Sequence, residues 1–142
     1  MNDTLVTDTG EDIVGIYFVC KNTYYAYRGD KIPAALALLT KADEVVTYNG
    51  NHYDLEQLRK FAGLPNDHAF QLNGVHTDMR EIIWSKRIWG KCLTDTFFEH
   101  FTEVPGFPDS YEGRNERDCY MTFKLWELWK KGKLSTLDGH SA

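Results

Sequence analysis

The chain has 142 residues, carries a formal net charge of −5, and is 42% hydrophobic and 26% charged. This length suits one domain, which we assign to residues 1–142, and the composition excludes a disordered or fibrous chain. No apolar run reaches the ~20 residues that cross a bilayer, and the acidic start is unlike a signal peptide, so we expect a cytoplasmic protein without membrane contact. The 3 cysteines are widely spaced, which favours buried free thiols over disulfides.

The first part of the chain is rich in β-branched and aromatic residues. Three such runs, over residues 4–9, 13–20 and 23–28, are separated by turn-like residues and predict an antiparallel meander. Pro33 then opens a helix of small residues, since proline suits the first helical turn. Residues 44–48 form a short apolar run, which predicts a buried strand.

The rest of the chain alternates helical patterns with one more strand. We expect the strand over residues 75–78 and helices over 54–62, 79–89, 93–101 and 112–131. Hairpins followed by crossover helices predict an α/β fold, in which helices flank a mixed sheet of a three-stranded antiparallel meander and parallel strands.

Three aspartates stand at positions where chemistry is plausible. Asp8 follows Leu5 and Val6 in the first run, where a carboxylate is unusual unless it has a function, although a turn entry explains it equally well. Asp54 begins a predicted helix, where capping is the ordinary explanation. Asp118 lies on the apolar stripe of the last helix, where a carboxylate is costly unless it is paired or binds a metal.

The segments around these aspartates resemble a known family. LVTDTGED, VVTYNGNHYDLEQL and NERDCYMTFKLWEL are similar to the motifs of the DEDD 3′–5′ exonucleases of the ribonuclease H-like superfamily. The most similar members are compact bacterial proteins related to the exonuclease domain of family B polymerases. The resemblance spans nearly the whole chain. It implies a ribonuclease H-like fold and hydrolysis of single-stranded DNA or RNA from the 3′ end by two divalent cations, Mg²⁺ or Mn²⁺.

The resemblance also implies roles for individual residues. The metal-binding and catalytic carboxylates would be Asp8, Asp54 and Asp118. The substrate groove would be lined by Asn49, Tyr48 and Tyr53, whose rings are suited to stacking on bases.

The chain departs from the family at two catalytic positions. Gly10 stands where the family has the glutamate of its first motif, and Glu11 is the candidate replacement if a bulge at the glycine turns it toward the metals. Arg114 stands where the family has a tyrosine, one helical turn before Asp118, where it can pair with that carboxylate or hold a phosphate.

Two functions therefore stay open. One is a metal-dependent exonuclease, weakly active because of the two departures. The other is a catalytically inactive module of the same fold that binds nucleic acid or protein. A nucleotide-cofactor enzyme has no support, since the sequence contains neither GxGxxG nor GxxxxGK[ST].

Overall fold

A computed structural model describes residues 3–84 and 91–134 of the chain. One five-stranded sheet has the order β3-β2-β1-β4-β5. The strands are β1 (Thr4–Gly10), β2 (Ile13–Phe18), β3 (Thr23–Tyr27), β4 (Glu44–Thr47) and β5 (Val75–Asp78). The first three strands pair antiparallel, while β4 pairs parallel with β1 and β5 with β4. The predicted meander and the mixed α/β sheet are confirmed.

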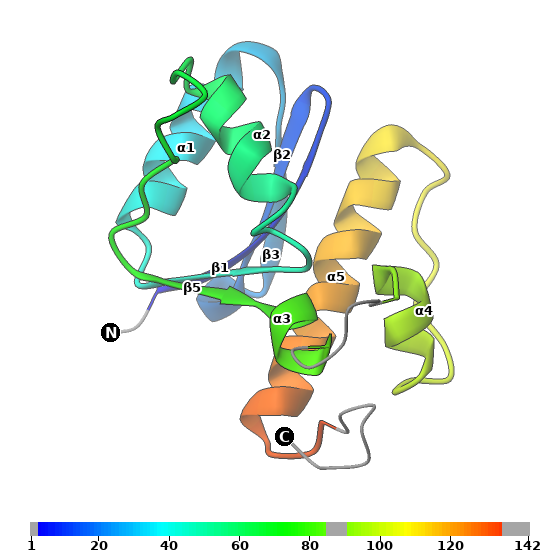
Figure 1. Cartoon of the computed structure of the whole chain (residues 1–142). Helices are drawn as coiled ribbons and strands as arrows, with labels where there is room; N and C mark the ends of the chain where they lie inside the picture. The colour runs from blue at the N-terminus through cyan, green and yellow to red at the C-terminus, as the bar shows by residue number, and fades with distance from the viewer. Residues whose placement is uncertain (1–2, 85–90, 135–142) are drawn as a thin grey trace.

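Five α-helices accompany the sheet in the described ranges. They are α1 (Ile32–Lys41), α2 (Asp54–Phe61), α3 (Met79–Trp84), α4 (Leu93–Phe98) and α5 (Tyr111–Lys130). Figure 1 shows α1 and α2 together on one side of the molecule and α5 on the other, with α3 and α4 next to α5. The predicted helix over residues 93–101 ends early, at Phe98. The predicted extension of α3, residues 85–89, lies outside the described residues.

Two hydrophobic cores cover the two faces of the sheet. Alternate side chains of a strand point to opposite faces, so Leu5 joins the core under α1 and α2, and Val6 joins the core under α5. The same alternation directs Asp8 toward α5 and Thr9 toward α2. The central strand β1 therefore presents polar groups to helices of both layers at its carboxyl end.

The sequence predicts that the cysteines are buried free thiols. Cys20, Cys92 and Cys119 are free thiols, but only Cys119 is buried. The prediction of burial was wrong for the other two, because Cys20 lies in a short 3-10 turn after β2 and Cys92 immediately precedes α4.

Among the described residues, no helix is both long and apolar enough to cross a membrane.

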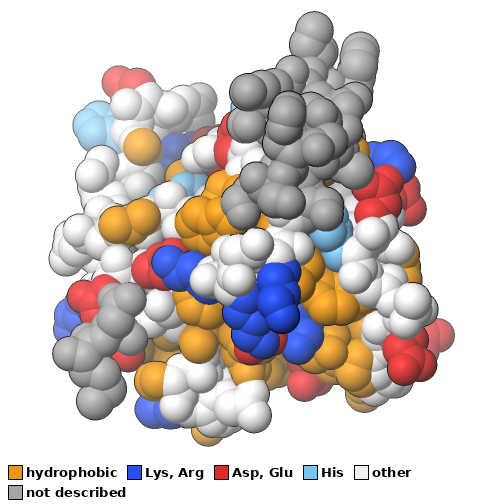
Figure 2. All heavy atoms as spheres, turned by 90° about the horizontal axis from the view of Figure 1, so that it is seen from below, with side chains coloured by type: hydrophobic (Ala, Val, Ile, Leu, Met, Phe, Trp, Pro, Cys, Tyr) orange, Lys and Arg blue, Asp and Glu red, His pale blue; other side chains and the backbone are white. Residues whose placement is uncertain are grey.

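The carboxyl end of α5 lies far from the carboxyl end of β1. Figure 2 shows the face seen from below, where Lys and Arg side chains gather beside hydrophobic ones. In the last turns of α5, Lys130 Nζ lies 5.8 Å from the ring centre of Trp126 and 5.1 Å from that of Trp129. These cation–π contacts give this lysine partners on its own helix.

Candidate functional site

Asp8 lies where β1 meets α5. Asn115 of α5 donates from Nδ2 to the backbone oxygen of Asp8 at 3.0 Å and to Asp8 Oδ2 at 3.1 Å. This close approach requires Gly15 on the neighbouring strand, because a Cβ there would overlap the Asn115 amide. Asp8 Oδ1 has no hydrogen-bond partner in the described part of the chain, so one oxygen of this fixed carboxylate is left for a ligand.

Asp54 is the first residue of α2 and is only 1% exposed. Its Oδ1 accepts hydrogen bonds from Thr9 N at 3.1 Å and from Thr9 Oγ1 at 2.5 Å. The cap position of α2 belongs to Tyr53, so capping does not explain this aspartate. Asp54 instead joins α2 to β1, and its Oδ2 has no partner among the residues described.

Asp118 lies on α5, one helical turn after Asn115, with its side chain 31% exposed. Its Oδ1 accepts a weak hydrogen bond from Arg117 Nη2 at 3.4 Å, while no hydrogen bond to Oδ2 occurs within the described ranges. Arg114 pairs with Asp109 at 3.3 Å. The alternative that Arg114 pairs with Asp118 is therefore not realised.

Two cavities meet at Asp8. The larger, of about 390 Å³, is lined by Asp8, Tyr48, Asn49, Tyr53, Asp54, Arg80, Lys91, Cys92 and Leu93. The smaller, of about 230 Å³, is lined by Asp8, Thr9, Gly10, Ile13, Tyr111, Arg114, Asn115, Arg117 and Asp118. Asp8 thus shares one cavity with Asp54 and the other with Asp118, and all three groove residues expected from the sequence line the larger cavity.

The three carboxylates act on one another electrostatically. Burial raises the pKa of Asp8 well above its usual value, and the negative charges of Asp54 and Asp118 raise it further, against the lowering effect of Arg117. Burial raises the pKa of Asp54 to about 7, although hydrogen bonds from Thr9 oppose the shift. Burial also raises the pKa of Asp118. The charge of Arg117 only partly offsets the three carboxylates, and a bound cation would add the positive charge that the cluster still needs.

The donors fit a hard divalent cation in kind. Carboxylate oxygens are the ligands that Mg²⁺ and Mn²⁺ prefer, and each of the three aspartates keeps one oxygen without a described partner. Within residues 3–84 and 91–134, however, no group of three or more His, Cys, Asp or Glu side chains is already gathered to hold a metal. The fit therefore lies in donor chemistry and charge rather than in a preformed coordination shell.

Glu11, the candidate fourth carboxylate, does not line the candidate site. The β1–β2 pairing runs residue by residue to Gly10↔Ile13, so the bulge considered from the sequence is absent. Glu11 is exposed in the connecting turn and lines neither cavity. A Cβ at Gly10 would instead overlap the hydroxyl of Tyr111, which fills the space of the missing side chain. Tyr111 lies two helical turns before Asp118, a spacing that points to the same helix face.

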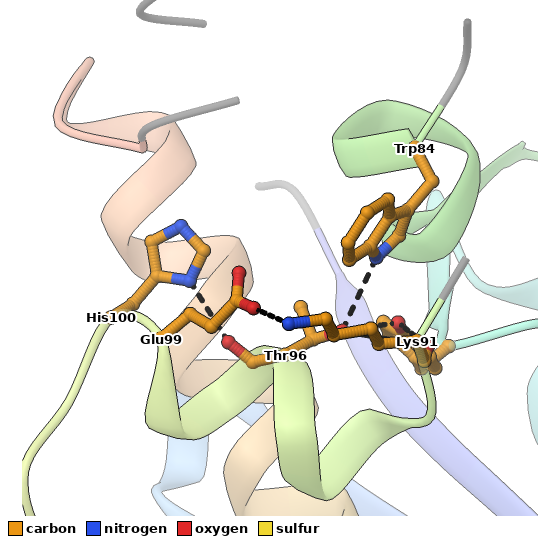
Figure 3. A network of polar contacts seen from close by, with 6 residues as sticks. Trp84, Lys91, Thr96, Glu99 and His100 are labelled. Carbon is orange, nitrogen blue, oxygen red and sulfur yellow. Dashed lines mark hydrogen bonds and ion pairs between the residues drawn. The ribbon is translucent and has the colours of Figure 1, made fainter. Parts of the chain in front are cut away.

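One wall of the larger cavity is held by a polar network, shown in Figure 3. The Tyr48 hydroxyl donates to the backbone oxygen of Lys91 and lies 2.7 Å from Thr96 Oγ1. Trp84 Nε1 also donates to Thr96 Oγ1, at 3.2 Å, and Lys91 Nζ pairs with Glu99. Because its hydroxyl is engaged in this network, Tyr48 contributes its ring to the cavity rather than a free hydroxyl.

Two further residues were not identified from the sequence. Asp78, 5% exposed at the end of β5, accepts hydrogen bonds from the backbone N–H groups of Asn49 at 2.7 Å, Asn51 at 3.1 Å and Arg80 at 3.1 Å. It thereby holds the turn before α2, in which Asn49 has a φ of 67°. The sequence feature that could have identified Asp78 is its place at the end of a predicted strand. Arg80 lines the larger cavity and forms no ion pair in the described chain.

Comparison with known proteins adds no relative. No protein-family model matches the sequence, and no curated protein matches it. A function for this site must therefore be argued from the residues and their geometry.

Proposed function

We propose that the chain is a ribonuclease H-like 3′–5′ exonuclease that uses Mg²⁺ or Mn²⁺ to hydrolyse phosphodiester bonds at the 3′ ends of single-stranded DNA or RNA. One observation carries this proposal. Asp8, Asp54 and Asp118 come from three separate elements, line two adjoining cavities, and each keep one oxygen without a described partner. The mixed sheet with helices on both faces is compatible with the ribonuclease H-like fold.

The proposed role of the three aspartates is to hold the cation. A divalent cation held there would supply positive charge to the scissile phosphate and its leaving oxygen. The pKa of Asp54, which burial raises to about 7, means that this carboxyl is partly protonated at neutral pH without the cation. Cation binding is therefore expected to release protons and to strengthen as pH rises.

Other side chains of the larger cavity suit a nucleotide. The guanidinium of Arg80 has the fork geometry that binds phosphate oxygens, and it has no competing ion pair among the described residues. Tyr53 is 49% exposed and offers a ring on which a terminal base can stack. With a volume of about 390 Å³, the cavity lies within the range of small-ligand sites.

A specific observation favours the second candidate, an inactive module that binds nucleic acid or protein. The Tyr111 hydroxyl occupies the space that a carboxylate-bearing side chain at position 10 would enter. The site then has three acids rather than four. Fewer carboxylates weaken the hold on a second cation, on which two-metal hydrolysis depends.

The test is an exonuclease assay with matched aspartate variants. Single-stranded DNA and RNA oligonucleotides labelled at the 5′ end are incubated with the protein and Mn²⁺. We expect stepwise shortening from the 3′ end by the parent and by Asp67→Asn, whose exposed side chain lies outside both cavities, and none by Asp8→Asn. Intact oligonucleotides that still bind the parent would favour the module. Equal cutting by Asp8→Asn would refute the site.

A further inference from the structure

A third cavity adjoins the 230 Å³ cavity at Arg114 and Arg117 of α5. It has a volume of about 330 Å³ and is lined by Val104, Pro105, Gly106, Phe107, Pro108, Asp109, Gly113, Arg114 and Arg117. Arg114 and Arg117 also line the 230 Å³ cavity that contains Asp8 and Asp118. The three cavities therefore form a series in which neighbours share residues, and we call the third one the arginine groove.

The two arginines of this groove make few and weak polar contacts with the rest of the described chain. Arg117 Nε is buried without a hydrogen-bond partner in the described chain, and Arg117 Nη2 makes only the 3.4 Å contact to Asp118. The Arg117 side chain is nevertheless 38% exposed and lines two cavities, so a ligand oxygen can approach its guanidinium. Among the residues that the structure describes, Arg114 pairs only with Asp109, whose side chain is fully exposed, and such surface pairs are weak.

Because the chain is acidic overall, binding of an anionic ligand requires basic side chains at the binding site. The chain has a net charge of −5, and the carboxylates at the centre of the cavity series repel phosphate in the absence of a cation. Binding of a nucleic-acid strand draws much of its affinity from contacts between basic side chains and phosphates. The arginine groove provides two guanidinium groups next to Asp118, against the single carboxylate of Asp109.

We propose that the arginine groove binds a backbone phosphate of the strand whose 3′ end lies at Asp8, Asp54 and Asp118. The identity of this ligand rests on the proposed function, but the groove is a separate subsite that requires a phosphate beyond the terminal one. A strand of many nucleotides can place one phosphate at the carboxylates and another in the groove, whereas a dinucleotide has one internucleotide phosphate and can fill only one of the two sites. The protein should therefore bind longer strands more tightly.

The experiment measures strand binding without catalysis. Fluorescence anisotropy in EDTA at low salt compares 5′-labelled oligothymidylates of two and ten nucleotides. We expect Arg117→Gln to weaken binding of the ten-nucleotide strand about tenfold and Arg114→Gln to weaken it less. Each lost phosphate contact should reduce the slope of log affinity against log salt by about 0.7. Lys60→Gln, an exposed change of the same charge on α2 outside the three cavities, should bind like the parent.

The controls separate this subsite from folding and from catalysis. Thermal unfolding shows whether each variant is folded, and the exposed Arg114 keeps the test valid if Arg117→Gln does not fold. Unchanged affinity for the ten-nucleotide strand in folded arginine variants would refute the groove, even if Mn²⁺-dependent exonuclease activity is found. Arginine-dependent binding without any hydrolysis would support the groove and overturn the exonuclease. Preferential, arginine-dependent binding of a polyglutamate peptide would assign the groove to an acidic protein instead.

Discussion

Replacing Asp54 with asparagine should change how the stability of the cation-free protein depends on pH. Asp54 is 1% exposed, and burial raises its pKa to about 7 from the ordinary 3.8. The folded protein therefore retains a proton that the unfolded chain has already released. The contribution of this group to stability is fully present below pH 3.8, decreases as pH rises toward 7, and is lost above that value.

The size of the effect follows from the shift itself. One pKa unit corresponds to 1.36 kcal/mol, so the full decrease is about 4 kcal/mol, of which about 3 kcal/mol falls between pH 5 and pH 8. Asparagine carries no charge over this range and retains an oxygen that can accept the two hydrogen bonds from Thr9. The variant should lose this pH dependence and be more stable than the parent at pH 8. Removing the charge of Asp54 also lowers the pKa of Asp8, which acts in the same direction.

The assay is urea unfolding in EDTA at several pH values from 5 to 8, with Asp67→Asn as the control. The Asp67 side chain is 85% exposed, so its substitution should leave the pH dependence of the parent unchanged. Parallel stability curves for the parent and Asp54→Asn would refute the reasoning, as would a variant less stable than the parent at pH 8. Adding Mn²⁺ should stabilise the parent more at pH 8 than at pH 5, and should have a smaller effect on the variant.

Three further predictions concern neighbouring residues. Gly10→Ala should lower the unfolding free energy by about 1–3 kcal/mol, because the new Cβ overlaps the Tyr111 hydroxyl and lies 2.9 Å from Ile13 Cγ2. A double-mutant cycle with Tyr111→Ala should recover part of that loss, and strict additivity would contradict the overlap. Asp78→Asn should lower the unfolding free energy in urea by about 1.5–3 kcal/mol. The three N–H groups donate to both carboxylate oxygens of Asp78, and an amide has only one oxygen to accept them. A variant as stable as the parent would show that these hydrogen bonds are dispensable. Calorimetric titration should find about one Mn²⁺ per chain and none in Asp8→Asn, whereas unchanged heats in that variant would place the ion elsewhere.

The sheet could be predicted from the sequence because its strands carry strong local signals. The β-branched and aromatic runs locate β1, β2 and β3, and the short turns between them favour antiparallel pairing. Helix ends were less predictable, since α4 stops at Phe98 although aromatic residues continue to Phe101. Phe101 joins the core by stacking on Phe97, at 4.7 Å between ring centres, without extending the helix. Side-chain packing here does not require helical backbone, so hydrophobic pattern alone overestimates the length.

The site could be predicted only in part. Asp8 and Asp118 stood out because a carboxylate is unusual in a strand and on an apolar stripe, whereas Asp54 stood out through the resemblance of its segment to a family motif. Asn115 and Tyr111 of α5 did not stand out, because their places depend on Gly15 of β2 and Gly10 of β1, where a side chain would overlap them. Such complementarity between distant positions has no local signal in one sequence.

The identity of residue 10 bears on how many cations the site can hold. The Tyr111 hydroxyl accepts a hydrogen bond from Asp12 N at 3.3 Å, and the Arg28 guanidinium lies over the Tyr111 ring, 5.0 Å from the ring centre. Tyr111 therefore connects the β1–β2 turn to α5. A glutamate at position 10 would displace that ring and add a negative charge beside Asp8. With glycine there, the cluster has the charge of three carboxylates, which one divalent cation reduces to about −1 and a second would make positive. The packing of Tyr111 over Gly10 and the single cation that we predict would therefore be two consequences of the glycine at this position.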